Sequence, residues 1–224
     1  MSNYLSKEYK TQLHEKVVKA AAVLFMNKGY TAASTREIAK AAGVQVSAMN
    51  RAFGCKEMIL CELVSYILEG QLSSVKKRVA SLTDDKVIIY TVSSALQLYM
   101  AEMNEAVRDM YCNAYSLSET SEMILRKITE QMIAPTFGEY FPEYTMEDFY
   151  QLELASGSII RGYMLVRCSE QFDIVKKVER FLETAFRIYC VPNEKAEEAL
   201  NFLRKIDFVT LSHTAISDLM GFIK

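Results

Sequence analysis

Residues 46–51 carry side chains of the types that form hydrogen bonds and close contacts with the edges of nucleic-acid bases. Met49 and Phe53, four residues apart, would share the inner face of a helix, which leaves five other side chains facing outward. These are the side chains of Val46, Ser47, Ala48, Asn50 and Arg51. Because they are small or polar, they could lie against the floor of a DNA major groove. The alternative is an ordinary solvent-exposed face, but Glu37 is the only acidic residue within 35–56.

Two preceding helices and a tight turn would be needed to hold this segment in place. Apolar residues recur at helical spacing over residues 13–25, which predicts a first helix. Ser34 or Thr35 can cap a second, short helix, and Gly43 can end it. The small residues of 41–44 would let the second and third helices approach closely, with Gly43 in a positive-φ conformation. The pattern therefore predicts a helix-turn-helix.

Charge is distributed unevenly along the chain of 224 residues. Residues 1–60 contain nine Lys and Arg residues against four Asp and Glu residues, a formal charge of +5, and the remainder carries −7. A basic head on an acidic body indicates that the head contacts a polyanion, although an excess of this size can also arise by chance.

Residue types that support catalysis or metal binding are sparse and scattered. The only histidines, His14 and His213, are far apart in sequence, and the five cysteines form no Cys-x-x-Cys pair. No nucleophile elbow or phosphate-binding loop occurs, so we expect neither an enzyme nor a metal or cofactor site. An odd number of scattered cysteines, no signal segment and no apolar run of 18 residues favour a cytoplasmic protein without a membrane span.

The remainder of the chain is predicted to be helical throughout. A long helix should begin near Lys56 and run to about Leu82, and it would join the two parts without a flexible linker. Further helices are expected near 85–107, 117–134, 146–169, 173–190, 194–211 and 214–223. Pro135 and Pro142 bracket a segment that should be a loop or a single helical turn.

Three motifs in one order resemble the tetracycline-repressor (TetR) family of transcriptional regulators. They are VVKAAAVLFMNKGYT at 17–31, TREIAKAAGV at 35–44 and FGCKEMIL at 53–60. The resemblance covers about residues 13–62, and the rest of the chain matches in length and helical pattern only. It implies an all-α fold, with a three-helix helix-turn-helix head followed by a larger ligand-binding and dimerisation domain.

The resemblance also implies roles for individual residues of the head. Thr35 would cap the second helix against a phosphate, Arg36 would contact a base or phosphate, and Lys56 would clamp a phosphate. The recognition helix would contain Val46, Ser47, Ala48, Asn50 and Arg51, of which Arg51 could bind guanine and Asn50 adenine. Asn50 stands where the family usually has Tyr. Fewer backbone contacts, with weaker or more salt-sensitive binding, are expected, and the alternative is an unusual operator.

Met and aromatic residues are concentrated in the second part of the chain. Such side chains could line an apolar ligand pocket, but for each of them plain core packing is the alternative. Arg161, beside apolar neighbours, could pair with an anionic ligand, form a structural ion pair or point to solvent. The candidate ligand-binding residues are Tyr99, Met103, Tyr111, Tyr115, Phe137, Tyr150, Arg161 and Met164.

The last long helices are expected to form the interface of a homodimer, as they do in the family. One apolar stripe comprises Val178, Phe181, Leu182, Ala185, Phe186 and Tyr189, and another comprises Leu200, Leu203 and Phe208. Together with their copies they would build a four-helix interface, over which the tail from His213 could pack.

These observations predict a DNA-binding domain at 1–55 and a ligand-binding and dimerisation domain at 56–224. The expected function is that of a repressor that a small-molecule effector releases from a palindromic double-stranded DNA operator. The alternative is a DNA-binding regulator without a ligand, acting as an activator or through protein partners. A body cavity of about 300 Å³ or more would favour the first hypothesis, and a filled core would favour the second.

Overall fold

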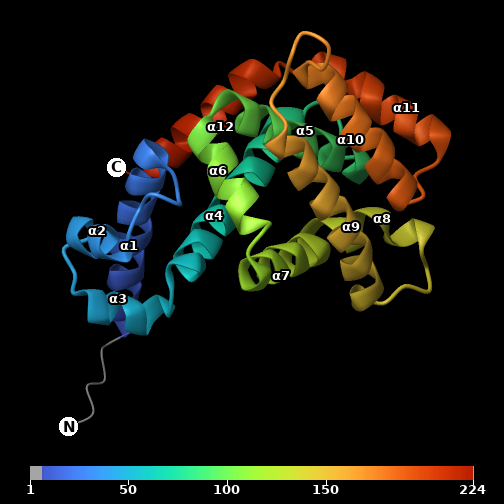
Figure 1. Cartoon of the computed structure of the whole chain (residues 1–224). Coiled ribbons are helices and arrows are strands. Elements are labelled where there is room, and N and C mark those ends of the chain that lie inside the picture. The colour runs from blue at the N-terminus through green and yellow to red at the C-terminus, as the bar shows by residue number, and fades with distance from the viewer. Residues whose placement is uncertain (1–6, 224) are drawn as a thin grey trace.

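The structure is a computed structural model that describes residues 7–223, and it contains helices and no strands within that range. Helices α1 (Lys7–Lys28), α2 (Thr35–Ala41) and α3 (Val46–Phe53) form a small head. Figure 1 shows α4 (Lys56–Val79) running diagonally from this head into the larger body. The predicted all-α class with an N-terminal helix-turn-helix is therefore confirmed.

The body consists of helices packed around α5 (Lys86–Met103), which is buried on most of its surface. A π-helical turn at Thr129–Ile133 joins α7 to α8. Of the two alternatives expected between Pro135 and Pro142, a loop or a helical turn, the structure shows short helical turns up to Tyr140. The other helices are α6 (Glu105–Ala114), α7 (Ser118–Ile128), α8 (Ala134–Phe137), α9 (Met146–Leu165), α10 (Ile174–Ile188), α11 (Asn193–Phe202) and α12 (Phe208–Ile223).

Helix α4 is the one described helix that is long and apolar enough to cross a membrane by length and composition. It packs against α1, α5, α6, α7 and α12, and its buried side chains include Leu60, Leu63, Val64 and Ile67. The core helix of a folded protein passes the same test, so the packing accounts for its apolar character.

Two predicted helix boundaries were wrong because local capping overrides the apolar periodicity. The helix expected at 85–107 is divided at Asn104, whose Oδ1 accepts a hydrogen bond from the backbone N–H of Val107 and so caps α6. The helix expected at 194–211 ends at Phe202, and α12 begins at Phe208 after Asp207, which accepts a bond from the N–H of Thr210. The last helix is therefore longer than predicted.

The predicted dimer-forming stripe of α10 was also wrong, because its side chains pack inside the protomer. Val178, Phe181, Leu182, Ala185, Phe186 and Tyr189 are all buried, and α10 packs against α5 and α9. Of the second stripe, Phe208 is buried and stacks on Tyr99, while Leu200 and Leu203 are partly buried. Helix α12 packs mainly against α5, α4 and α1 rather than over a dimer bundle. An interface with a second copy would therefore have to use other faces.

Helix α9 packs tightly against a side chain of α7 at Gly157. A Cβ atom added there would lie 2.6 Å from Cδ2 of Leu125, which is itself 2% exposed. The variant Gly157→Ala should therefore have a lower Tm than the wild type, because overpacking costs about 1–3 kcal/mol. The higher helix propensity of Ala returns less than about 1 kcal/mol.

Gly70→Ala is the matched control for this measurement, because Gly70 lies on the exposed side of α4 with no atom within 4 Å of an added Cβ. It should keep or raise the Tm. If thermal unfolding shows Gly157→Ala to be as stable as Gly70→Ala, the two helices are not in tight contact.

Candidate nucleic-acid interface and ligand cavity

The turn between α2 and α3 has the predicted geometry. Gly43 has a φ of +66°, and its N–H donates to the carbonyl of Lys40, while the N–H of Val44 donates to the carbonyl of Ala39. An L residue with a side chain rarely adopts this conformation, so glycine suits the position. Met49 and Phe53 are buried, as expected for the inner face of α3.

The outer face of α3 presents three exposed polar side chains, those of Ser47, Asn50 and Arg51. Val46 and Ala48 are half-buried, and Val46 packs partly against the core of the head. Among the residues that the structure describes, the guanidinium of Arg51 makes only a long hydrogen bond, 3.4 Å from Nε to the carbonyl oxygen of Ser47. This face is therefore polar at its centre, with an apolar margin at the start of the helix.

Helix α2 begins with a capping box that involves Ser34 rather than Thr35. The N–H of Glu37 donates to the hydroxyl of Ser34, and the carboxylate of Glu37 accepts from the N–H of Ser34 at 2.9 Å. Thr35 is the first helical residue and is partly exposed, and Arg36 follows it with an exposed side chain. Of the two caps that the sequence allowed, the structure selects Ser34.

The single acidic residue in this region is neutralised within the head. Glu37 Oε1 lies 2.6 Å from Nζ of Lys28, and the bonds from Lys28 and Ser34 lower the pKa of Glu37 to about 2. Arg36, Lys40 and Arg51 are exposed and form no ion pair within the described residues. The outer face of the head therefore keeps its positive charge.

Lys56 lies at the start of α4 and points toward the loop between α1 and α2. Its ammonium donates to the carbonyl oxygens of Tyr30 and Ala33, both at 3.0 Å, and lies 4.1 Å from the ring centroid of Tyr30. Desolvation lowers the pKa of Lys56. The same loop is bound from the body, since the N–H of Tyr30 donates to Oδ2 of Asp109 on α6 at 2.7 Å. Two body helices thus hold the loop that precedes α2.

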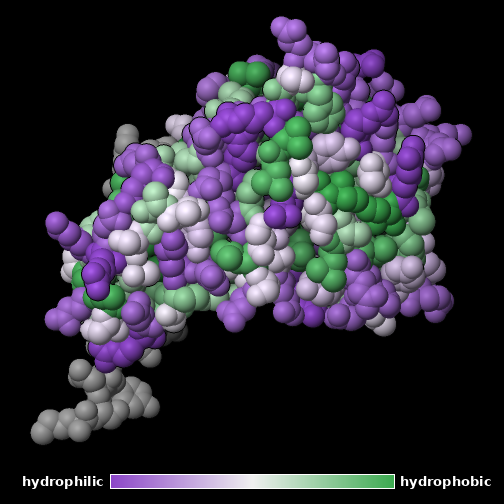
Figure 2. All heavy atoms as spheres, viewed as in Figure 1, coloured by the Kyte–Doolittle hydropathy of each residue, from purple (hydrophilic) through white to green (hydrophobic). Residues whose placement is uncertain are grey.

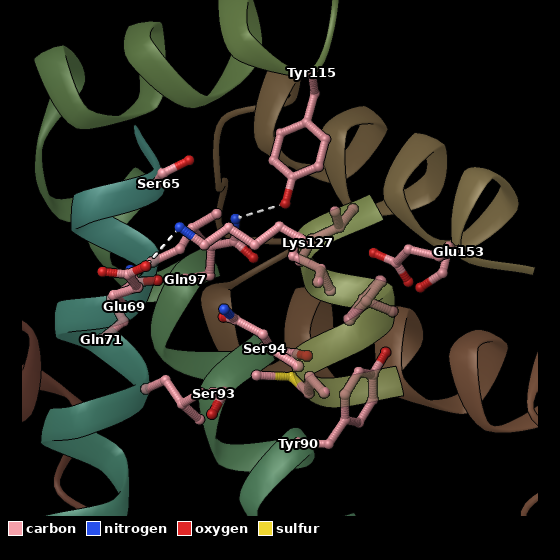
Figure 3. Close-up of a pocket in the computed structure, with 18 residues that line it drawn as sticks. Ser65, Glu69, Gln71, Tyr90, Ser93, Ser94, Gln97, Tyr115, Lys127 and Glu153 are labelled. Atoms are coloured by element: carbon pink, nitrogen blue, oxygen red, sulfur yellow. Dashed lines mark hydrogen bonds and ion pairs between the residues drawn. The ribbon is translucent and has the colours of Figure 1, made fainter. Parts of the chain in front are cut away.

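A separate cavity lies inside the body, between α4, α5, α7, α9 and α10 (Figure 3). Its volume is about 70 Å³, well below the roughly 300 Å³ that a drug-sized ligand occupies. Apolar side chains such as Leu68, Ile160 and Phe181 make up much of its wall. Polar groups contribute the remainder, among them Ser93, Ser94, Gln97, Tyr115, Ser156 and Glu153.

Two polar contacts of the cavity wall are satisfied between neighbouring helices, as the dashed lines in Figure 3 show. Nε2 of Gln97 donates to the hydroxyl of Tyr115 at 3.1 Å. Lys127 Nζ lies 2.5 Å from Oε1 of Glu69 in an ion pair between α7 and α4. This positive charge is therefore already paired.

Glu153 is the buried carboxyl group of the cavity, with 5% of its surface exposed. Its Oε2 accepts a hydrogen bond from the hydroxyl of Tyr189. Burial raises the pKa of Glu153 to about 7, because desolvation penalises the ionised form more than the Tyr189 bond stabilises it.

Of the eight side chains predicted to bind a ligand, only Tyr115 lines this cavity. The other seven side chains lie outside its wall. Tyr99 stacks on Phe208, Phe137 stacks on Tyr189, Tyr111 and Met164 are buried, Arg126 lies 4.0 Å from the ring centroid of Tyr150, Arg161 donates to Ser116 and Met103 is 38% exposed.

The predictions missed the polar side chains of the cavity wall, chiefly Ser94, Gln97 and Glu153. The sequence did contain a sign of the cavity. Ser93, Ser94 and Gln97 are polar residues within the otherwise apolar sequence of α5, on positions that a buried helix would turn inward. A polar side chain on a buried helix face needs a partner or a cavity, so such positions point to a pocket more directly than aromatic residues do.

The raised pKa of Glu153 makes folding stability dependent on pH. Between the ordinary value of 4.5 and about 7, the folded protein retains a proton that the unfolded chain releases, so stability should fall as pH rises through this window. The contribution lost is at most about 3 kcal/mol. Urea unfolding at pH 5 and pH 8 should show this loss in the wild type and little of it in Glu153→Gln.

Glu119→Gln serves as a control at an exposed glutamate and should leave the pH profile of the wild type unchanged. Equal pH profiles for Glu153→Gln and the wild type would mean that Glu153 ionises as freely in the folded protein as in the unfolded chain.

Comparisons with known proteins agree with the geometry of the head. Residues 17–63 match the family model described as bacterial regulatory proteins, tetR family. The probable HTH-type transcriptional regulator YttP of Bacillus subtilis is 26% identical over 157 residues, which are 69% of this chain and 69% of YttP. The crystal structure of RolR in complex with resorcinol has a TM-score of 0.64 at 13% identity, and covers 88% of this chain and 95% of RolR. The helix-turn-helix head at residues 17–63 therefore resembles that of bacterial regulatory proteins of the tetR family.

Proposed function

We propose that this regulator is a cytoplasmic repressor that binds a palindromic operator as a homodimer and is released by a small-molecule effector. The observation that carries the proposal is the connection of an exposed, cationic helix-turn-helix face to a body that contains a partly polar cavity. Helix α4 contributes to both, since Lys56 holds the loop before α2 and Leu68 and Gln71 line the cavity. The division between the DNA-binding and effector-binding domains is placed after residue 55.

The proposed DNA contacts use the exposed side chains of α2 and α3. Arg51 donates two hydrogen bonds to guanine, and Asn50 pairs with adenine, while Ser47 and the margin of Val46 and Ala48 contact neighbouring bases. Thr35 and Arg36 contact the phosphate backbone at the start of α2. Lys56 has two N–H groups engaged with carbonyl oxygens, so its third N–H is the one directed to a phosphate.

The proposed effector site is the cavity between α4, α5, α7, α9 and α10. RolR, which has a similar fold, was crystallised with resorcinol. For this chain the size argument comes from its own cavity, whose volume of about 70 Å³ requires either a small effector or widening of the cavity on binding.

Widening would act on the head through the helices that hold the α1–α2 loop. The cavity wall includes Gln71 on α4, and α4 begins at Lys56, which binds the carbonyl oxygens of that loop. A change in α4 therefore shifts the support of α2 and α3, while Asp109 on α6 holds the same loop from the body. The effector lowers operator affinity only to the extent that it binds the two arrangements with different affinities.

The proposed dimer interface is the outer face of α9, in place of the buried stripe of α10. Small side chains, those of Ala155, Ser158 and Gly162, lie exposed along this face, flanked by Leu154 and Leu165, which are 39% and 56% exposed. Figure 2 shows hydrophobic residues gathered on the side of the body where α9 lies. Small residues allow two helices to approach closely, and the apolar rim provides area to bury.

One observation favours the second hypothesis, a regulator that acts without a small-molecule effector. The cavity is smaller than the 300 Å³ expected of a formed ligand site, so the body could be a filled core whose partner is another protein. The two hypotheses share the DNA interface and differ in whether any compound that binds the body alters operator affinity.

Selection of genomic DNA fragments by the purified protein at fixed salt tests the DNA-binding proposal. The wild type should enrich one palindromic site, and Arg51→Ala should lose this enrichment, because each bidentate base contact supplies about 1–3 kcal/mol of discrimination. Arg204→Ala, at an exposed arginine far from the head in sequence, should behave as the wild type. Weak, uniform binding that Arg51→Ala does not change would contradict sequence recognition by α3.

Light scattering of the purified chain tests the proposed dimer interface. The variant Ala155→Arg should be a monomer where the wild type is a dimer, because a charged side chain would be buried without a partner at the centre of the interface. Glu119→Arg, at an exposed position on α7, should stay dimeric. A dimeric Ala155→Arg would show that the copies associate through another surface.

A further inference from the structure

We propose that the effector of this cavity is a small organic cation, whose ammonium group pairs with Glu153 while its apolar part lies against the aromatic wall. This proposal rests on the proposed effector site and names the class of compound that the site binds.

The first argument is that Glu153 is a buried acid without a cationic partner. It is 5% exposed, its Oε2 accepts one hydrogen bond from Tyr189, and within the described residues it forms no ion pair. Another buried ionisable group does have a partner of opposite charge. Nζ of Lys177, a residue that is 1% exposed, lies 2.7 Å from Oε2 of Glu102. A buried carboxylate is costly to ionise unless a positive charge lies beside it, so a cation from outside the chain would stabilise the ionised form of Glu153.

The second argument is that the wall around Glu153 suits a cation and not an anion. Tyr90, Tyr115 and Phe181 place aromatic rings on the same cavity, and a cation is attracted to the face of such rings. Figure 3 shows Glu153 and Tyr90 entering the cavity from different helices. The one lysine of the wall, Lys127, is paired with Glu69 and leaves no positive charge for an anionic ligand.

Among the ionisable groups of the cavity, Glu153 is the one expected to change its charge near neutral pH. Burial raises the pKa of Tyr90 on α5, of Tyr115 after α6 and of Tyr189 after α10, so all three phenols stay neutral. The ion pair of Lys127 and Glu69 completes the charged groups of the wall. Protons and the proposed cation therefore compete for Glu153, whose pKa is about 7 in the folded protein.

The experiment measures binding to the purified wild-type chain, without DNA, by calorimetric titration and thermal shift. The probes are methylammonium, benzylamine and 2-phenylethylamine, and the neutral controls benzyl alcohol and 2-phenylethanol. An amine should bind more tightly than its alcohol by about tenfold or more, as expected for a hydrogen bond to a charged group. Its affinity should rise about tenfold between pH 6 and pH 8, as Glu153 loses its proton.

Two variants separate the role of Glu153 from folding. Glu153→Gln keeps the shape of the side chain and should lose the preference for the amine and the pH dependence. Tyr189→Phe removes the hydrogen bond to the carboxylate but not the charge, so it should keep the preference for the amine and shift its pH dependence upward. Circular dichroism establishes that each variant is folded.

Equal binding of amine and alcohol, no change in Glu153→Gln, or no binding of any amine at millimolar concentration would each overturn the proposal. Measuring operator affinity alongside amine binding distinguishes a failure of this proposal from a failure of the proposed function. Amines that bind at Glu153 without altering operator affinity would support the ligand class and contradict induction. Operator binding that another compound releases, with no amine bound, would support induction and overturn the ligand class.

Discussion

Helix α5 is surrounded by other helices, and the arrangement of the body follows from the need to satisfy its buried surface. Most of its side chains are apolar, but Thr91, Ser93 and Ser94 are buried as well. The hydroxyls of Thr91 and Ser93 donate hydrogen bonds to carbonyl oxygens of the same helix, and Nε2 of Gln97 donates to the hydroxyl of Tyr115 at the end of α6. Where such groups face a gap rather than a neighbour, the interior becomes a polar cavity instead of a closed core.

The head was predictable from sequence because its elements depend on local chemistry. The turn requires a glycine at residue 43, the capping box requires Ser34 and Glu37, and the inner face requires Met49 and Phe53. Each of these signals lies within a few residues of the structure that it determines. The same holds for the all-α class, since apolar periodicity reports on each helix separately.

The organisation of the body was less predictable because it depends on contacts between distant segments. An apolar stripe on α10 indicates that one face of the helix is buried, but it does not indicate whether the same chain or a second copy covers that face. The stripe proved to pack on α5 and α9. Aromatic residues were poor guides to the cavity for the same reason, since Phe137 and Tyr189 satisfy each other by stacking. Glu153 gave no signal in sequence beyond being an acid on an apolar helix.

Helix α9 faces the cavity on one side and the surface of the body on the other, and this arrangement bears on how the proposed dimer would respond to an effector. Glu153, Ser156 and Ile160 line the cavity, while Leu154, Ala155 and Ser158 lie on the outer face. In the proposed dimer, only one helix would separate an effector bound in the cavity from the two-fold axis, and the same helix of the second copy would lie directly behind it. If effector binding in one cavity shifts α9, it would change the affinity of the other cavity, and the proposed transcriptional response would be cooperative, with a threshold in effector concentration.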